Sequence, residues 1–176
     1  KALSAELEGV IITGRSNAPI QEALYNAGLV ANSTHTFESE AKAITAAQLQ
    51  PGTSQSTSIF YPQRTTIESF DEFRYFTGVT EILSHTFRGC QALTSITLPN
   101  TLIDVNCAAF RDCSSLLSVT LPNMVESIGS NIFYDCSNLE SLYIPASVKS
   151  TGSNMFRGCN KLHIVVDANT QNFSSL

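Results

Sequence analysis

The feature that most constrains this chain is a 23-residue pattern written four times without a gap, from Val79 to Thr170. The copies begin at Val79, Leu102, Val125 and Val148. Each copy carries a phenylalanine, a cysteine and a leucine in step: Phe87, Phe110, Phe133 and Phe156; Cys90, Cys113, Cys136 and Cys159; Leu93, Leu116, Leu139 and Leu162. Self-similarity at a fixed period of this size is typical of stacked repeat proteins. The sequence therefore predicts a stack of similar coils around one core.

Residue alternation predicts the layout of each coil. Ile96 and Leu98 alternate with Ser95 and Thr97, so the apolar pair should face inward and the hydroxyls outward on a strand. A proline ends the strand in three copies because proline cannot donate to a ladder of backbone hydrogen bonds. We expect the rest of each copy to return as a helical or 3₁₀-like turn. Stacking then gives a parallel sheet and continuous phenylalanine and leucine columns.

Residues 1–68 share none of this pattern and predict an N-terminal α/β cap, since the open end of a stack needs covering. We expect strands at 7–12 and 59–61 and helices at 17–28 and 38–49. Residues 69–78 form a lead-in to the array, and Phe70, Phe73 and Phe76 place an aromatic stripe on one face of a helical turn. That stripe is interpreted as core that covers the first coil.

The repeat resembles a known family. Residues 113–136 follow the pattern Cys-x-x-Leu-x-x-Val-x-Leu-Pro-x-x-Val-x-x-Ile-Gly-x-x-x-Phe-x-x-Cys. This is similar to the 23-residue leucine-rich repeat of BspA-like, or Treponema-type, surface proteins, and the lead-in resembles the segment that opens such arrays in gut Bacteroidales proteins. The resemblance implies a leucine-rich-repeat solenoid with a parallel sheet on its concave face. The domains expected are a cap at 1–68 and an array at 69–176, with a tail at 171–176.

The family resemblance also implies a function class. Its members are exported bacterial surface or secreted proteins, several of them thought to act in adhesion. Some relatives carry a calcium loop upstream, but residues 31–40 of this chain lack the aspartate ladder and glycine that such a loop requires. No metal or cofactor is expected.

The last copy departs from the pattern. Asp167 and Ala168 stand where Leu98 and Pro99 stand in the first copy, and Thr151 replaces an isoleucine. A charged residue on a final strand keeps a sheet edge from pairing with other chains. The pattern therefore favours a true C-terminal end of the array.

The charge and hydropathy of the chain argue against two classes of partner. The net charge is −5 and basic residues form no cluster in the sequence, so nucleic acid and anionic membrane surfaces are not expected partners. No apolar run is long enough to cross a bilayer, so no membrane insertion of this segment is expected.

The five cysteines allow two interpretations. An oxidising, extracellular setting would permit disulfides. Four of them occupy one equivalent position, however, and pairing would break that equivalence, so a ladder of buried thiols is favoured. Cys107 has no equivalent cysteine in the other copies and is interpreted as a semi-buried thiol.

Motifs of catalysis are missing. The three histidines are scattered, no Cys-x-x-Cys pair occurs, and no nucleophile or phosphate-loop motif is present. The remaining candidate for a functional surface is the outward face of the predicted sheet. Its aromatic and charged positions, with two threonines, are the candidate contact residues: Thr97, Thr120, Glu140, Tyr143 and His163. Aromatic residues dominate binding hot spots, but serine and threonine also suit any exposed strand.

The absence of catalytic motifs predicts a non-enzymatic module, and the family resemblance implies an exported bacterial one of adhesion type that presents its concave sheet to an unidentified protein or glycan, with host-derived molecules among the candidates. The alternatives are a structural spacer or a self-associating element of a larger surface assembly. An enzyme would need a pocket in the cap.

Overall fold

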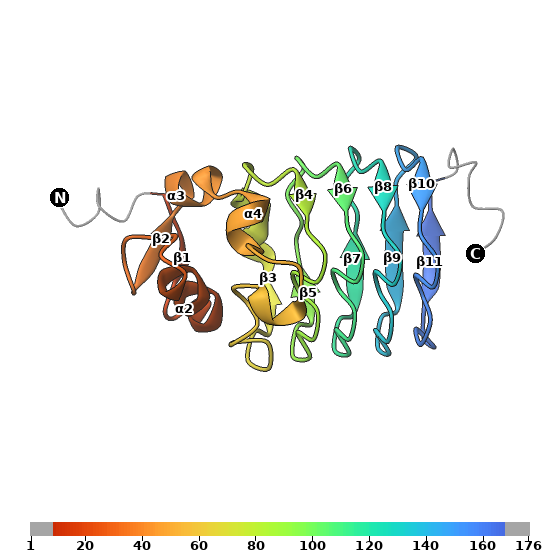
Figure 1. Cartoon of the computed structure of the whole chain (residues 1–176), viewed down its shortest axis with the longest axis horizontal. Helices are drawn as coiled ribbons and strands as arrows, with labels where there is room; N and C mark the ends of the chain where they lie inside the picture. The colour runs from red at the N-terminus through yellow and green to blue at the C-terminus, as the bar shows by residue number, and fades with distance from the viewer. Residues whose placement is uncertain (1–8, 168–176) are drawn as a thin grey trace.

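The computed structural model describes residues 9–167 of the 176-residue chain. A small N-terminal cap precedes a row of stacked coils, whose strands form two parallel rows (Figure 1). The coils follow one another in a nearly straight line, so the predicted concavity is slight over this short array (Figure 1). This is the parallel-sheet solenoid that the repeats predict.

The cap is an antiparallel pair of strands packed against a helix. β1 (Val10–Thr13) pairs with β2 (His35–Phe37), and α2 (Ala18–Asn26) lies between them in sequence. The helix ends as its sequence predicts: Gly28 adopts a φ of 73°, and the Leu29 backbone N–H reaches back to the Leu24 carbonyl at 3.0 Å. The first part of the strand expected at 7–12 lies outside the described residues.

The single helix expected at 38–49 is wrong. The structure has two short helices, α3 (Glu38–Ala43) and α4 (Ala46–Leu49), separated by extended backbone at Ile44 and Thr45. Ile44 is buried in the core, and Thr45 is the N-cap of the second helix, where Gln48 Oε1 accepts a hydrogen bond from the Thr45 backbone N–H at 2.9 Å, as in a capping box. Burial and capping together override the helical composition of the segment.

The strand expected at 59–61 is also wrong. A short 3₁₀ helix, η1 (Gln55–Thr57), and a series of turns occupy this part of the chain. The ring of Phe60 is nevertheless fully buried and stacks on Phe87 with centroids 4.9 Å apart. The segment thus forms an irregular first coil, and the stack begins earlier in the sequence than the lead-in.

The lead-in continues this first coil. β3 (Ser69–Phe70) pairs in parallel with β5 (Ser95–Ile96), at a spacing of 26 residues instead of 23. The 3₁₀ helix η2 (Asp71–Tyr75) follows directly. Phe70, Phe73 and Phe76 are all fully buried, which confirms that the aromatic stripe is core.

Two parallel ladders run along the stack. One contains β7 (Ser118–Thr120), β9 (Ser141–Ile144) and β11 (His163–Val166), with β3 and β5 continuing it toward the cap. The other contains β4 (Glu81–Ile82), β6 (Asp104–Val105), β8 (Ser127–Ile128) and β10 (Ser150–Thr151). The return leg begins with a short strand, which the expectation of a helical or 3₁₀-like turn did not include. The remainder of that leg consists of 3₁₀-like turns, since the Arg88 backbone N–H donates to the His85 carbonyl at 3.2 Å and the Cys90 N–H donates to the Phe87 carbonyl at 3.1 Å.

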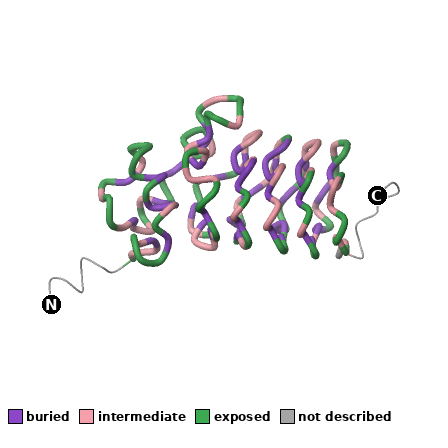
Figure 2. The backbone as a smooth tube through the Cα atoms, turned by 90° about the horizontal axis from the view of Figure 1, so that it is seen from below, coloured by how far each residue is buried: buried purple, intermediate pink, exposed green. Residues whose placement is uncertain are grey.

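Inside the coils, the phenylalanines form a continuous stack. Phe87, Phe110 and Phe133 follow one another at centroid distances of 5.4 and 5.6 Å, with interplanar angles of 9° and 13°. Phe156 extends the stack at 6.4 Å and is less buried. Buried residues recur among exposed ones along the coils before the last one, as the repeated purple, pink and green segments of Figure 2 show, and Met155 is buried in the last coil.

The cysteines form the predicted ladder. The thiols of Cys113, Cys136 and Cys159 donate to the carbonyl oxygens of Phe87, Phe110 and Phe133 in the preceding coil, at 3.0 to 3.1 Å. Each thiol thus joins one coil to the next by a hydrogen bond. Burial raises the pKa of Cys90 to about 12 and raises the pKa of the other three in the same direction.

Cys107 is exposed, so the prediction of a semi-buried thiol is wrong. It follows the short strand β6, where the return leg turns at the surface. The side chains of its two successors, Ala108 and Ala109, are buried in its place.

The last copy contains a register shift that the ungapped alignment misses. His163 pairs with Ser141, and Ile164 and Val166 pair with Leu142 and Ile144, at a spacing of 22 residues. One residue has been lost between Leu162 and the strand. Ile164 and Val166 therefore occupy inward positions, although the ungapped 23-residue alignment would place them on the outward face. Asp167 therefore takes the position of Pro145 instead of the leucine position expected from the 23-residue alignment, and its backbone N–H donates to the Ile144 carbonyl at 3.1 Å. Ala168 and the tail lie outside the described residues.

Candidate functional site

The outward side chains of β5, β7 and β9 form a polar surface, here called the strand face. It consists of alternate residues of successive coils: Ser95, Thr97, Ser118, Thr120, Ser141 and Tyr143. Val119 and Leu142, between them in sequence, are buried. The alternation follows from the two-residue period of a strand, which sends apolar residues to the core and hydroxyls to the surface.

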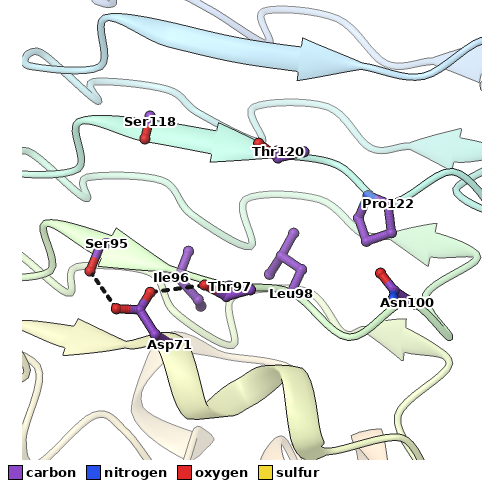
Figure 3. Close-up of a pocket in the computed structure, with 9 residues that line it drawn as sticks. All are labelled: Asp71, Ser95, Ile96, Thr97, Leu98, Asn100, Ser118, Thr120 and Pro122. Carbon is purple, nitrogen blue, oxygen red and sulfur yellow. Dashed lines mark hydrogen bonds between the residues drawn. The ribbon is translucent and has the colours of Figure 1, made fainter.

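A carboxylate stands at the cap end of the strand face. Asp71, on η2, accepts hydrogen bonds from Ser95 Oγ at 3.1 Å and Thr97 Oγ1 at 3.0 Å, as the dashed lines in Figure 3 show. The geometry arises because η2 follows β3 immediately and so lies over the start of the next coil. Asp71 fixes the rotamers of two hydroxyls and leaves negative charge at this end of the strand face.

A groove of about 320 Å³ opens beside this carboxylate. Ser118, Thr120 and the side chain of Asn100 complete its polar wall, and Leu98 and Pro122 supply apolar surface (Figure 3). The hollow continues past Thr120 and Asn123 to Tyr143. The lining combines hydrogen-bond donors, acceptors and a half-buried aromatic ring, the mixture expected where a polar ligand lies along a surface.

At the other end of the strand face, the Tyr143 hydroxyl donates to Asp167 Oδ2 at 3.0 Å. This hydrogen bond, and secondarily burial and the charge of Asp167, raise the pKa of Tyr143. The bond holds the ring against the end of the stack. A second carboxylate therefore lies at the far end of the same row of hydroxyls.

The five sequence-predicted contact residues divide into two groups. Thr97, Thr120 and Tyr143 lie along the groove. Glu140 and His163 are exposed at the beginning of β9 and β11, and the register shift places His163 opposite Ser141. The Tyr143 hydroxyl donates a hydrogen bond to Asp167, and not to Glu140.

Three polar groove residues were not predicted from the sequence: Asp71, Asn100 and Asn123. Asp71 lies in the lead-in, whose 26-residue offset from the first regular coil hides its position in the stack. Its signal would have been the alignment of Phe70 with Ile96. Asn100 follows the strand-ending Pro99 and carries no motif.

The described residues contain no cluster of three or more histidine, cysteine, aspartate or glutamate side chains placed to hold a metal ion. Within residues 9–167, no helix has both the length and the apolar character needed to cross a membrane.

Comparison with known proteins agrees with this architecture. A sequence model of the BspA type leucine-rich repeat region matches residues 53–175 in six copies. The chain belongs to the BspA-type leucine-rich repeat family. The match includes the irregular first coil around Phe60, which strict 23-residue periodicity omits. A search of curated proteins finds no match.

Solved structures similar to this BspA-type chain come from several bacteria. The leucine-rich repeat protein TpLRR of T. pallidum is 29% identical, with a TM-score of 0.45 over 55% of this chain and 50% of that one. A leucine-rich repeat protein of Bacteroides ovatus is 25% identical, with a TM-score of 0.45 over 58% and 37%. A leucine-rich cell surface protein of Faecalibacterium prausnitzii is 25% identical, with a TM-score of 0.37 over 51% and 30%. The matched region thus spans half or less of each of these proteins.

Proposed function

We propose that this chain is a non-enzymatic binding module of an exported bacterial protein, held at the cell surface or secreted, with a role of adhesion type. Its ligand, a protein or a glycan, lies along the strand face. The observation that carries the proposal is the groove between Asp71 and Tyr143, in which regularly spaced hydroxyls, an amide and a ring face solvent together.

The physical case rests on preorganisation. Asp71 fixes the hydroxyls of Ser95 and Thr97, and Asp167 fixes the Tyr143 ring, so a ligand would meet side chains that are already ordered. Binding then costs less conformational entropy than it would on a mobile surface. Backbone strands packed on a continuous aromatic core provide a rigid support for these side chains.

The experiment is a binding screen over host matrix proteins and glycans. The parent is compared with Thr120→Ala/Tyr143→Phe, which removes two groove hydroxyls and keeps the ring. The matched control is Thr80→Ala/Tyr25→Phe, which makes the same chemical changes at exposed positions away from the groove. We expect a saturable ligand whose affinity falls at least about fivefold in the groove variant, because each lost hydrogen bond contributes on the order of 1 kcal/mol.

Four results would contradict the proposal. Equal losses of affinity in the groove variant and in the control would show that the ligand binds elsewhere or binds non-specifically. A saturable ligand that ignores the groove variant would move the site off the strand face. Absence of saturable binding across the screen would favour the spacer alternative, and a mass that rises with protein concentration would favour self-association.

A further inference from the structure

A second surface lies on the return leg of the coils, away from the strand face. There the stack gathers basic side chains that the sequence scatters over more than 90 positions. Three of them directly follow the phenylalanines of the core stack, at a spacing of 23 residues or twice that, and a fourth comes from the irregular first coil. The arginine row consists of Arg64, Arg88, Arg111 and Arg157.

Contacts between coils hold the row together. Arg64 approaches the next coil closely, since a Cβ atom built on Gly89 would lie 3.8 Å from Arg64 Cδ. Asp112 lies between the next two members: its Oδ2 is 3.8 Å from both Arg88 Nε and Arg111 Nε. Neither Nε atom has a hydrogen-bond partner in the described structure. One carboxylate is thus shared by two guanidinium groups at long range.

Two tyrosines support the row. The Arg64 guanidinium lies 3.9 Å from the Tyr61 ring centroid. Tyr134 takes the arginine position in the third copy, and Arg111 and Arg157 approach its ring at 4.4 and 5.7 Å. Cation–π contact orders these guanidinium groups without neutralising their charge.

The charge of this edge differs in sign from that of the chain. The row contributes four positive charges, and the neighbouring column contributes two negative charges, from Asp112 and Asp135. The net charge of the whole chain, by contrast, is −5. Burial, and after it the charges of Arg88 and Arg111, lower the pKa of His85 beside the row. The edge is therefore a positive strip along the stack axis.

We propose that the arginine row binds a linear anionic polysaccharide, sulfated or carboxylated, laid along the stack. Between adjacent coils, the rings of the phenylalanines that precede the row lie 5.4 to 6.4 Å apart, centroid to centroid. A polysaccharide with an anionic group on each sugar carries its charges at a comparable spacing along an extended chain.

The covered tyrosines argue against single-stranded nucleic acid. Proteins that bind it offer free aromatic faces on which bases stack. Here guanidinium groups occupy the faces of Tyr61 and Tyr134. The row therefore presents charge and hydrogen-bond donors without a stacking platform.

Heparin is the probe, with neutral dextran as the uncharged polymer and oligodeoxythymidine as the nucleic acid. The parent is compared with Arg88→Gln/Arg111→Gln/Arg157→Gln. The control, Arg15→Gln/Arg74→Gln/Lys149→Gln, changes the net charge equally at exposed sites away from the row. We expect the row variant to bind heparin at least tenfold more weakly, since each arginine near an anionic surface contributes on the order of fivefold. The control should bind like the parent, and parent binding should weaken as salt rises.

Equal losses in the two triple variants would overturn the proposal, because binding would then follow net charge alone. The proposal would also be overturned if the parent bound dextran as tightly as heparin, or did not bind heparin. Tighter binding of oligodeoxythymidine than of heparin would overturn it too and would identify a nucleic-acid surface. If the triple variant does not fold, the heparin affinity of Arg157→Gln tests the proposal, because that side chain is exposed and its replacement leaves the fold intact. Thr120→Ala/Tyr143→Phe should keep full heparin affinity, which separates this surface from the strand face.

Discussion

Phe133 shows how much a single ring contributes to the stack. It is fully buried between Phe110 and Phe156, at 5.6 and 6.4 Å. Phe133→Ala should lower the free energy of unfolding by about 3–5 kcal/mol, because it removes buried apolar surface and leaves a cavity between two coils. Urea denaturation measures the loss. Phe133→Leu, which fills most of the space, should lose less, and an unchanged midpoint for Phe133→Ala would contradict the stacked core.

The buried thiols make stability depend on alkaline pH. An unfolded cysteine ionises near 9.0, whereas burial raises the pKa of Cys90 to about 12 and that of Cys113 in the same direction. The folded state thus holds protons that the unfolded state releases. The thiols' contribution to stability is complete below pH 9 and is lost as pH rises from 9 toward 12.

The measurement compares urea midpoints at about pH 8 and about pH 10. The parent should lose stability over this interval, and Cys90→Ala/Cys113→Ala should lose less, because two of the groups responsible are gone. A variant as pH-sensitive as the parent would show that other groups, such as tyrosines, cause the loss.

At the scale of the element, close approach between coils fixes where glycine is needed. A Cβ atom on Gly129 would lie 2.5 Å from the Cys107 backbone nitrogen and 2.8 Å from the Asn106 carbonyl carbon. Gly129→Ala should therefore lower the free energy of unfolding by about 1–3 kcal/mol, because backbone must move apart to admit the methyl group. Gly14→Ala is the control, since a Cβ there meets nothing within 4 Å. Equal midpoints for the two variants would contradict the coil spacing.

The elements also show what sequence could and could not predict. The 23-residue period predicted the coils, the inward and outward positions of Val119 and Thr120, and the thiol ladder, because each depends on residue type at a repeated position. The break between α3 and α4 was not predictable from composition, since it depends on burial of Ile44 by distant residues. The register shift before β11 also escaped, because Leu162 and Cys159 keep the 23-residue phase up to that point.

Some residues of the candidate site could be predicted from the sequence, and others could not. Thr97, Thr120 and Tyr143 followed from strand alternation within regular copies. Asp71 and the arginine row could not be predicted in this way. The position of Asp71 depends on how the irregular first coil packs on the next coil, and the row depends on which side of the stack the return leg occupies. Periodicity locates a residue within its own coil. It says less about residues contributed by coils that break the period.

For the whole molecule, one core runs from the cap to the last coil. The buried residues extend in a single cluster from Ile12, in β1, to Met155 in the fourth copy. Phe60 and Phe87 join the irregular coil to the regular ones by stacking. The strand face and the arginine row are therefore two surfaces of one rigid body, and substitutions on one should leave the other intact.

The most direct test of the account blocks the strand face. Ser118→Arg places a long side chain in the middle of the groove, and Ser150→Arg makes the same change at an exposed strand position on the other ladder. Titration of each variant with the ligand found in the screen gives the dissociation constants. The account predicts that Ser118→Arg weakens binding at least about tenfold, through steric exclusion of a ligand that fits the groove, while Ser150→Arg matches the parent. Equal affinities for the two variants would contradict a ligand site on the strand face.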